Sequence, residues 1–389
     1  MVQFFGCLAV NQQKKNSNIP NDIFTKFERN YLKMRRQSKK FLKDYLNANS
    51  PTGFETPGQK IWLDYIKPYI DEYEVDTYGT VIGVINPGKQ YKVVIEAHAD
   101  EIAWYVNYID DKGYIYVKRN GGSDHQIAPS MRVHLHTKKG MVDGIFGWPA
   151  IHVRSRTREP QPSSKNLTID VGAKNKAEVL KMGIDVGTIA TFDASFMELN
   201  KKYVVARAID NRGGGFMIAE VARKLKEENI ELPFSLYVVN AVQEEIGLRG
   251  AEMASRRIKP DVAIVTDVTH DTQSPMYNKK EQGDTKCGNG PAVTTGPAVQ
   301  NNLLQMILDV AKDNKIKVQK QAASRSTGTD TDAFAYSDIG VASALISLPL
   351  KYMHTTVETV AYKDIDDCIE LMYQTLIQLE AGHDFRYFT

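Results

Sequence analysis

Short apolar runs alternate along this chain with stretches of helical spacing. Four runs are rich in β-branched residues, at positions 92–98, 235–242, 262–267 and 341–347. Such runs predict buried parallel strands, because both faces of these strands are apolar. Helical spacing of apolar residues recurs over 215–227, 303–314 and 365–379. Strands that alternate with helices predict an α/β fold, with a doubly wound, mostly parallel sheet and helices on both faces.

The N-terminal part has a simpler pattern. Apolar residues at three-, four- and seven-residue steps predict a helix within 22–47, which is followed by the turn-rich segment 49–53. A second amphipathic helix through Trp62 and a strand at 79–85 come next. We expect residues 1–21 to form a flexible N-terminal extension.

Residues 113–202 break the α/β rhythm. They contain short alternating strands separated by Gly and Pro, at 114–117, 131–136, 167–171 and 188–192, and one modest helix near 176–182. We therefore predict a small all-β domain, residues 113–202, inserted into a catalytic α/β domain of residues 22–112 and 203–389.

Composition argues for an ordinary globular protein that acts on small molecules or peptides. Of 389 residues, 42% are hydrophobic and 25% charged, and the formal charge is only +2. No global field thus favours a nucleic acid or a membrane as partner. The three cysteines, Cys7, Cys287 and Cys368, follow no metal or redox spacing, and no apolar run approaches the ~18 residues of a membrane span. We expect a cytoplasmic location.

Metal-capable side chains gather at the predicted strand ends. His98 ends the first strand, Glu244 and Glu245 follow the second, Asp267 ends the third and His354 follows the fourth. A further acid, Asp210, precedes a Gly-rich helix start. In open α/β sheets, ligands bind beyond the carboxyl ends of the strands, so these side chains should meet at one edge.

Two imidazoles with several carboxylates suit Zn²⁺, Co²⁺ or Mn²⁺. Two ions about 3.5–4 Å apart require a carboxylate shared between them. Five ligands with one bridging acid would give each ion about three protein ligands and leave room for water, as in a catalytic zinc site. We predict two divalent ions per chain, with Zn²⁺ as the expected metal.

Each residue taken alone has a simpler interpretation. A histidine at a strand end can be a hydrogen-bonded structural residue, Asp210 can be a helix N-cap, and the two adjacent glutamates can form a solvated turn. The joint occurrence at one sheet edge favours the metal site. The remaining described candidates are interpreted as surface or packing residues: His125, His134, His136, His152 and His270.

Two loops have weaker functional interpretations. Residues 213–215 (GGG) lack the Lys-Ser/Thr of a phosphate loop, so close packing at a helix start is the better interpretation. Residues 326–330 (STGTD) form either a simple turn or a loop that helps to hold a substrate.

Five ordered motifs resemble those of one family: 97–102 (AHADEI), 208–212 (AIDNR), 243–247 (QEEIG), 266–267 (TD) and 352–355 (YMHT). They are similar to the motifs of the co-catalytic metallo-aminopeptidases that include the tetrahedral and glutamyl aminopeptidases. The likeness extends in order and spacing over about 41–379, the β domain included.

The resemblance implies a role for each residue. His98 and Asp267 would bind one ion, Glu245 and His354 the other, and Asp210 would bridge them. Glu244 would be the general base, because a carboxylate next to a ligand lies beside the activated water. Asp100, two residues beyond His98, would hydrogen-bond the imidazole and fix its tautomer.

The predicted function is therefore a metallo-aminopeptidase that removes N-terminal residues from short peptides. One alternative is a carboxypeptidase or deacylase with the same metals, which would need a cationic clamp such as Arg249 or Arg325. A non-catalytic binding protein is a second alternative, but it would be expected to lack the base or a ligand. A carbohydrase would leave the histidines unexplained.

The predicted β domain should serve assembly, because it is far in sequence from the chemical motifs and short strands leave edges that a partner can cover. The resemblance implies a hollow tetrahedral particle of twelve subunits built from dimers. A simple dimer is the alternative.

Overall fold

The computed structural model describes residues 34–154 and 159–388. From Gln37 onward the described residues belong to one compact unit, called the second unit below. Helix α2, Arg36–Asn47, is the described part of the helix predicted within 22–47. Cys7, the predicted N-terminal extension and the first part of that helix lie outside the described residues.

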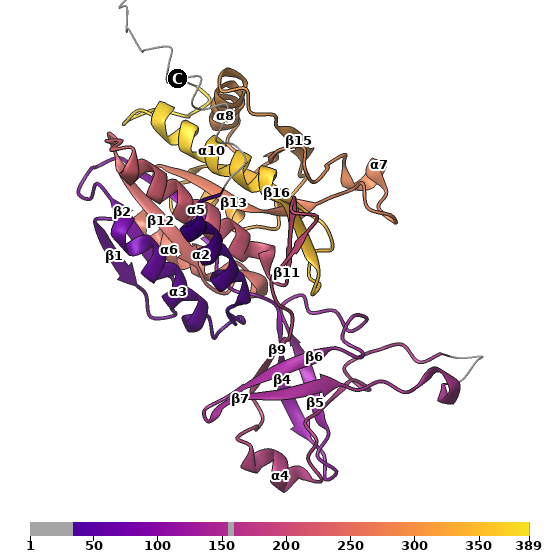
Figure 1. The fold of residues 1–389 in the computed structure, drawn as a ribbon. Coiled ribbons are helices and arrows are strands. Elements are labelled where there is room, and N and C mark those ends of the chain that lie inside the picture. Colours follow the sequence, from indigo (N-terminus) through magenta and orange to yellow (C-terminus); the bar gives the residue numbers. More distant parts are fainter. Residues whose placement is uncertain (1–33, 155–158, 389) are drawn as a thin grey trace, which may run out of the picture. The chain divides into compact units, whose positions relative to one another are not determined.

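An eight-stranded sheet forms the centre of the second unit (Figure 1). Its strands in spatial order are β1 (Glu72–Val75), β2 (Val81–Ile85), β12 (Ser235–Ala241), β3 (Lys92–His98), β13 (Val262–His270), β16 (Ala342–Leu350), β14 (Ala292–Thr295) and β15 (Gln319–Ala322). The four central strands, β12, β3, β13 and β16, run parallel. They are the four buried strands that the sequence predicted, so the mostly parallel α/β sheet is confirmed.

Helices cover both faces of this sheet. These helices are α3 (Thr56–Ile66), α5 (Ile209–Glu227), α6 (Arg249–Ile258), α8 (Asn301–Asp313), the short α9 (Thr331–Ala335) and α10 (Tyr362–Gln378). A Cβ added at Gly214 in α5 would lie 2.9 Å from Ala97 Cβ, so α5 packs on the Ala97 face of β3. Helix α6 packs on Ala241. Because Ala241 is in register with His98, the residue after Ala97, its side chain lies on the face of the sheet opposite to that of Ala97. The Gly-rich segment thus serves close packing, as predicted.

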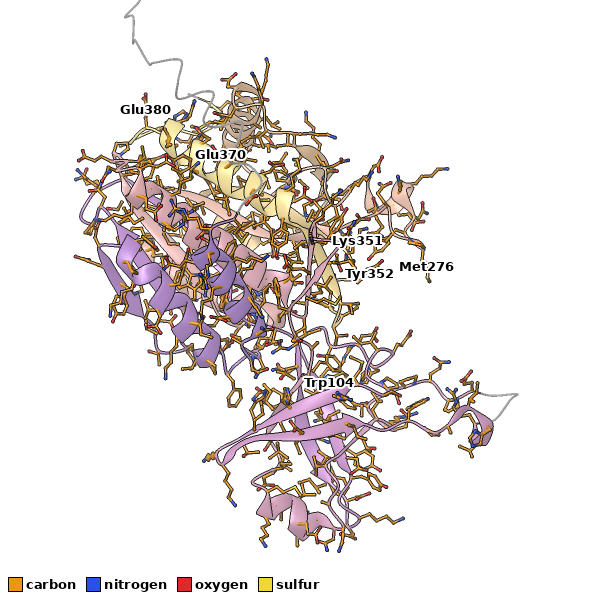
Figure 2. All side chains as sticks on the ribbon, viewed as in Figure 1. Trp104, Met276, Lys351, Tyr352, Glu370 and Glu380 are labelled. Atoms are coloured by element: carbon orange, nitrogen blue, oxygen red, sulfur yellow. The ribbon has the colours of Figure 1, made fainter. Side chains whose placement is uncertain are left out.

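Six strands form a closed barrel: β4 (Ala103–Ile109), β5 (Ile115–Asn120), β8 (Thr168–Asp170), β7 (Gly140–Phe146), β6 (Arg132–Thr137) and β9 (Ile189–Phe192). Trp104, labelled in Figure 2, is fully buried. Its ring packs edge-on against Phe146 and Phe192, with ring centroids 5.3 and 6.2 Å away. Apolar side chains therefore fill the barrel, as they must when so few strands close.

The barrel begins earlier than the predicted residue 113. Strand β4 starts at Ala103, and its register with β5 shifts between Val106 and Tyr108. This irregularity interrupts the apolar alternation by which a strand is recognised in sequence. The division into a catalytic domain and an inserted domain stays a prediction.

The remaining elements are short. They are the small sheet of β10 (Met197–Leu199), β11 (Tyr203–Ala206) and β17 (Glu358–Ala361), the helices α4 (Lys176–Lys181) and α7 (Lys279–Gln282), and the 3-10 turns η1 (Lys67–Tyr69), η2 (Ile151–Val153) and η3 (Glu244–Ile246). Within residues 34–154 and 159–388, no helix has the length and apolar character to cross a membrane. Cys287 and Cys368 are buried and form no disulfide.

Candidate metal centre

The parallel strands deliver the five predicted ligands to one edge of the sheet. His98 is the last residue of β3, and Asp267 lies on the neighbouring strand β13. Glu245 sits in η3, directly after β12, and His354 lies in the turn that follows β16. Asp210 is at the start of α5, where its φ and ψ are not yet helical. All five side chains are brought together.

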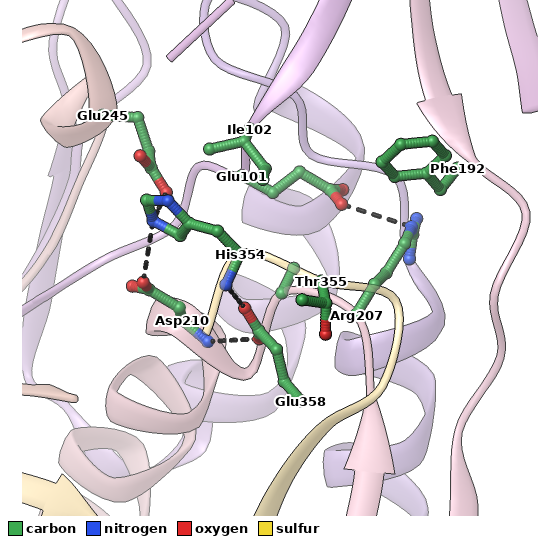
Figure 3. Close-up of a pocket in the computed structure, with 10 residues that line it drawn as sticks. Glu101, Ile102, Phe192, Arg207, Asp210, Glu245, His354, Thr355 and Glu358 are labelled. Carbon is green, nitrogen blue, oxygen red and sulfur yellow. Dashed lines mark hydrogen bonds and ion pairs between the residues drawn. The ribbon is translucent and has the colours of Figure 1, made fainter. Parts of the chain in front are cut away.

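The five side chains form two groups that share Asp210. In the first group, His98 Nε2 is 3.2 Å from Asp210 Oδ1 and 3.9 Å from Asp267 Oδ1. In the second, His354 Nε2 is 3.2 Å from Asp210 Oδ2 and 3.4 Å from Glu245 Oε1 (Figure 3). In each group the potential ligand atoms all lie within 4.8 Å of one another. Each oxygen of Asp210 therefore faces a different group.

The first group is buried and the second is partly buried, and both consist of ionisable side chains. Burial raises the pKa of Asp267 to about 7 and that of Glu244 to about 10. Burial disfavours the charged form of His354, but hydrogen bonds to Asp210 and Glu245 raise its pKa to about 11. The two imidazoles thus carry the positive charge that the carboxylates require. Divalent ions would supply that charge and leave both imidazoles neutral as ligands, so this donor set fits such ions.

Asp100 lies close to residues of both groups. It is fully buried, and its carboxylate accepts hydrogen bonds from Glu244 N at 3.0 Å, Glu245 N at 3.2 Å and Thr52 Oγ1 at 2.9 Å. Its Oδ1 also lies 3.3 Å from His98 Nδ1, although that ring nitrogen has no aligned acceptor. Asp100 therefore holds the backbone of both glutamates and lies beside the His98 ring.

Glu244 lies beside the first group. Its Oε2 is 3.6 Å from His98 Nε2. The side chain is almost buried, and its backbone is fixed by Asp100. A carboxylate in this position can exchange a proton with a molecule bound between the two groups.

Sequence reasoning missed Glu358, which orients two predicted ligands. This buried residue begins β17 and accepts hydrogen bonds from Asp210 N at 3.1 Å and His354 N at 2.8 Å (Figure 3). Burial raises its pKa well above the usual value. Its position four residues after His354 was the only sequence signal, and an exposed glutamate would give the same signal.

Sequence reasoning also missed a pair of buried acids, Glu96 and Asp330. Glu96 lies two residues before His98 on the same face of β3, and both acids are at most 1% exposed. Burial raises the pKa of Glu96 to about 8 and that of Asp330 well above its usual value, so one carboxyl group can donate to the other. Asp330 ends the loop 326–330 that the sequence left open between a turn and a substrate loop.

All five histidines set aside by the sequence lie outside the two groups in the described structure. His134 contacts Asp143 and Asp193 on the barrel surface, and His136 contacts Thr191. His125 packs edge-on against Trp104. These contacts agree with packing and surface roles.

A pocket opens onto the second group (Figure 3). Its walls include Asp210, Glu245 and His354. Arg207 and, from the barrel strand β9, Phe192 also line the pocket. Arg207 is nearly buried, and its guanidinium contacts Glu101 Oε2 at 3.2 Å and donates to Ala48 O and Asn49 Oδ1. The charge of Arg207 is therefore neutralised by Glu101, and its guanidinium already donates hydrogen bonds to Ala48 and Asn49.

An α/β sheet that presents two carboxylate and imidazole groups with a shared acid at its carboxyl edge defines the class of metal-dependent hydrolases. Comparison with known proteins identifies the family within this class. The model of the M42 glutamyl aminopeptidase family matches residues 79–371, and the chain belongs to this family. It is a metallopeptidase, a hydrolase of peptide bonds.

This chain is similar to several relatives over nearly their whole length. A lysyl aminopeptidase of Pyrococcus furiosus is 33% identical over 342 residues, which cover 87% of this chain and 96% of the relative. The structure of a TET aminopeptidase from Thaumarchaeota archaeon SCGC AB-539-E09 has a TM-score of 0.85 at 29% identity, with 89% and 98% covered. The TET1 peptidase of Pyrococcus horikoshii, described as assembling into a tetrahedron or a large octahedral shell, has a TM-score of 0.76 at 28% identity, with 88% and 100% covered.

Proposed function

We propose that the chain is an aminopeptidase with two divalent ions, which removes N-terminal residues from short peptides. His98 and Asp267 would hold one ion, Glu245 and His354 the other, and Asp210 both. The observation that carries the proposal is the Asp210 carboxylate, whose two oxygens each lie 3.2 Å from a different imidazole Nε2. Zn²⁺ is the expected metal, with Co²⁺ and Mn²⁺ as alternatives.

The chain's own residues would divide the remaining work. Two ions in such a site, when bound, supply Lewis acidity and a water of lowered pKa. Glu244 would take a proton from the attacking water and pass it to the leaving amine. Asp100 and Glu358 would hold the backbone around the ligands, and Asp100 would also orient the His98 ring.

The carboxypeptidase alternative is weaker, because it needs a cation free to bind a substrate carboxylate. Arg207 in the pocket wall is bonded to Glu101, Ala48 and Asn49. Arg249 lies 3.4 Å from Glu252 and is half exposed on the surface. Arg325, the other candidate, is exposed and does not line the pocket. None of these arginines supports a carboxylate clamp at the site.

The proposal is tested with metal-stripped and metal-loaded protein, assayed on aminoacyl chromogenic substrates and on N-blocked controls. We expect activity only with metal and only on free amino termini. Glu244→Gln should keep both ions by elemental analysis and lower turnover about 10²–10⁴-fold, since it removes a base and no ligand. Asp210→Ala should lose metal. Full turnover of the stripped protein, or cleavage of blocked substrates alone, would refute the proposal.

We also propose that the chain forms a closed homo-oligomer through its barrel, with a dodecamer built from dimers as the expected form. Support comes from exposed apolar side chains on and after β7, where Met141 is 55%, Ile145 50%, Ile151 76% and Val153 68% exposed. Twelve chains of 43.7 kDa would weigh about 524 kDa. Light scattering that gives the mass of one or two chains, with or without metal, would exclude the dodecamer.

A further inference from the structure

A loop of the barrel packs directly on the second metal group. The loop comprises residues 120–123, begins at the last residue of strand β5, and is called the 120–123 loop below. A Cβ added at Gly122 would lie 2.5 Å from His354 Nδ1 and 2.7 Å from its Cε1. A Cβ added at Gly121 would lie 3.1 Å from Glu245 Cβ. Only glycine allows the loop backbone to approach both side chains so closely.

The loop is anchored at both ends by buried polar side chains. Asn120 is 6% exposed and donates from Nδ2 to Thr52 O at 2.8 Å. Ser123 is fully buried and donates from Oγ to Ala103 O at 2.7 Å. Buried hydrogen bonds of this kind hold a backbone in one place, because breaking them would leave groups without partners.

One of these anchors leads back to the site. Thr52, which accepts from Asn120 through its carbonyl oxygen, donates through Oγ1 to Asp100 at 2.9 Å. Asp100 in turn accepts from the backbone N–H groups of Glu244 and Glu245. The loop and Glu245 are thus held in common by one buried hydrogen-bond chain.

The His354 ring needs such support. Its Nε2 edge faces Asp210 and Glu245, while its Nδ1 and Cε1 atoms face Gly122. The side chain is 33% exposed, more than any of its partners in the two groups. Without the loop against its other edge, the ring could rotate away from the acids towards solvent.

We propose that the 120–123 loop is a positioning element, through which the barrel fixes the His354 ring and the Glu245 side chain for binding of one ion. The inference rests on the proposed ligand roles of these two residues. The loop touches no reacting atom, and its effect would run entirely through the two ligands. The barrel would thereby contribute to the site as well as to assembly.

The test is Gly122→Ala, with Gly147→Ala as matched control. Gly122 has no positive φ, so the substitution acts only through its Cβ. Gly147 is also in the barrel, also lacks a positive φ, and has no atom within 4 Å of an added Cβ. We expect Gly122→Ala to weaken binding of the ion assigned to Glu245 and His354 about 10–100-fold in competition with a chromogenic chelator, as for other residues that orient metal ligands. Metal content after dialysis should fall from two ions to one, and Gly147→Ala should keep two.

A second variant guards against misfolding of Gly122→Ala. Ser123→Ala removes the hydrogen bond to Ala103 without adding an atom, and should weaken the same ion while the far-ultraviolet circular dichroism stays that of the wild type. If both folded variants bind two ions with wild-type affinity, the positioning role is wrong. If the wild-type protein binds fewer than two ions, the proposed two-ion function fails, whatever the variants do.

Discussion

Asp100→Asn should destabilise the protein even when no metal is bound. Asp100 is fully buried, and each of its carboxylate oxygens lies close to two polar N–H or O–H groups. Oδ1 accepts from Glu244 N and lies near His98 Nδ1, while Oδ2 accepts from Glu245 N and Thr52 Oγ1. An asparagine replaces one of these oxygens by an NH₂ group, which cannot accept from a backbone N–H.

The size of the effect follows from the bonds that are lost. A hydrogen bond to a charged acceptor contributes about 1.5–3 kcal/mol, and a buried N–H left without a partner costs about 1–3 kcal/mol. Whichever way the amide turns, one backbone N–H loses its acceptor, and the other bonds lose the help of the charge. We therefore expect Asp100→Asn to lower the free energy of unfolding by roughly 2–5 kcal/mol.

The assay is urea unfolding in the presence of a chelator, so that metal binding does not enter the measured stability. Asp110→Asn is the control, because Asp110 also accepts from two backbone N–H groups, those of Lys112 and Tyr114, but through Oδ1 alone. An asparagine there keeps both bonds and should cost less than about 1 kcal/mol. Equal stabilities of the two variants would refute the role assigned to Asp100.

Two further predictions concern stability away from the site. Burial raises the pKa of Asp366 to about 7 from 3.8, so its contribution to stability is intact below about pH 4 and is lost as the pH rises through 7. Asp366→Asn should therefore raise the free energy of unfolding at pH 8 but not at pH 4, and an equal change at both pH values would show that Asp366 is not the titrating group. Trp62 and Trp104 are both fully buried, but only the indole N–H of Trp62 has a partner, a carbonyl oxygen of α5 at 2.8 Å. Trp62→Phe should thus cost about 1–2 kcal/mol more than Trp104→Phe in urea unfolding, and equal losses would contradict this account.

The sequence by itself determined the central sheet and the place of the predicted ligands. Strands buried on both faces are mostly apolar, so β12, β3, β13 and β16 were recognisable as nearly continuous apolar runs. Their parallel direction brings their carboxyl ends to one edge, and this rule alone placed His98 and Asp267 near each other. Helices such as α10 were predictable because their apolar residues recur with the period of the helix.

Other features depended on tertiary structure. The sequence separated the β domain from the chemistry, yet the structure packs Gly122 of the barrel against His354 and lines the pocket with Phe192. The roles of Glu358 and of the Glu96 and Asp330 pair likewise follow from burial, which single residue types do not reveal. Periodicity records which face of an element is buried. It carries no information about which distant loop closes onto that face, because such contacts are set by the packing of whole elements.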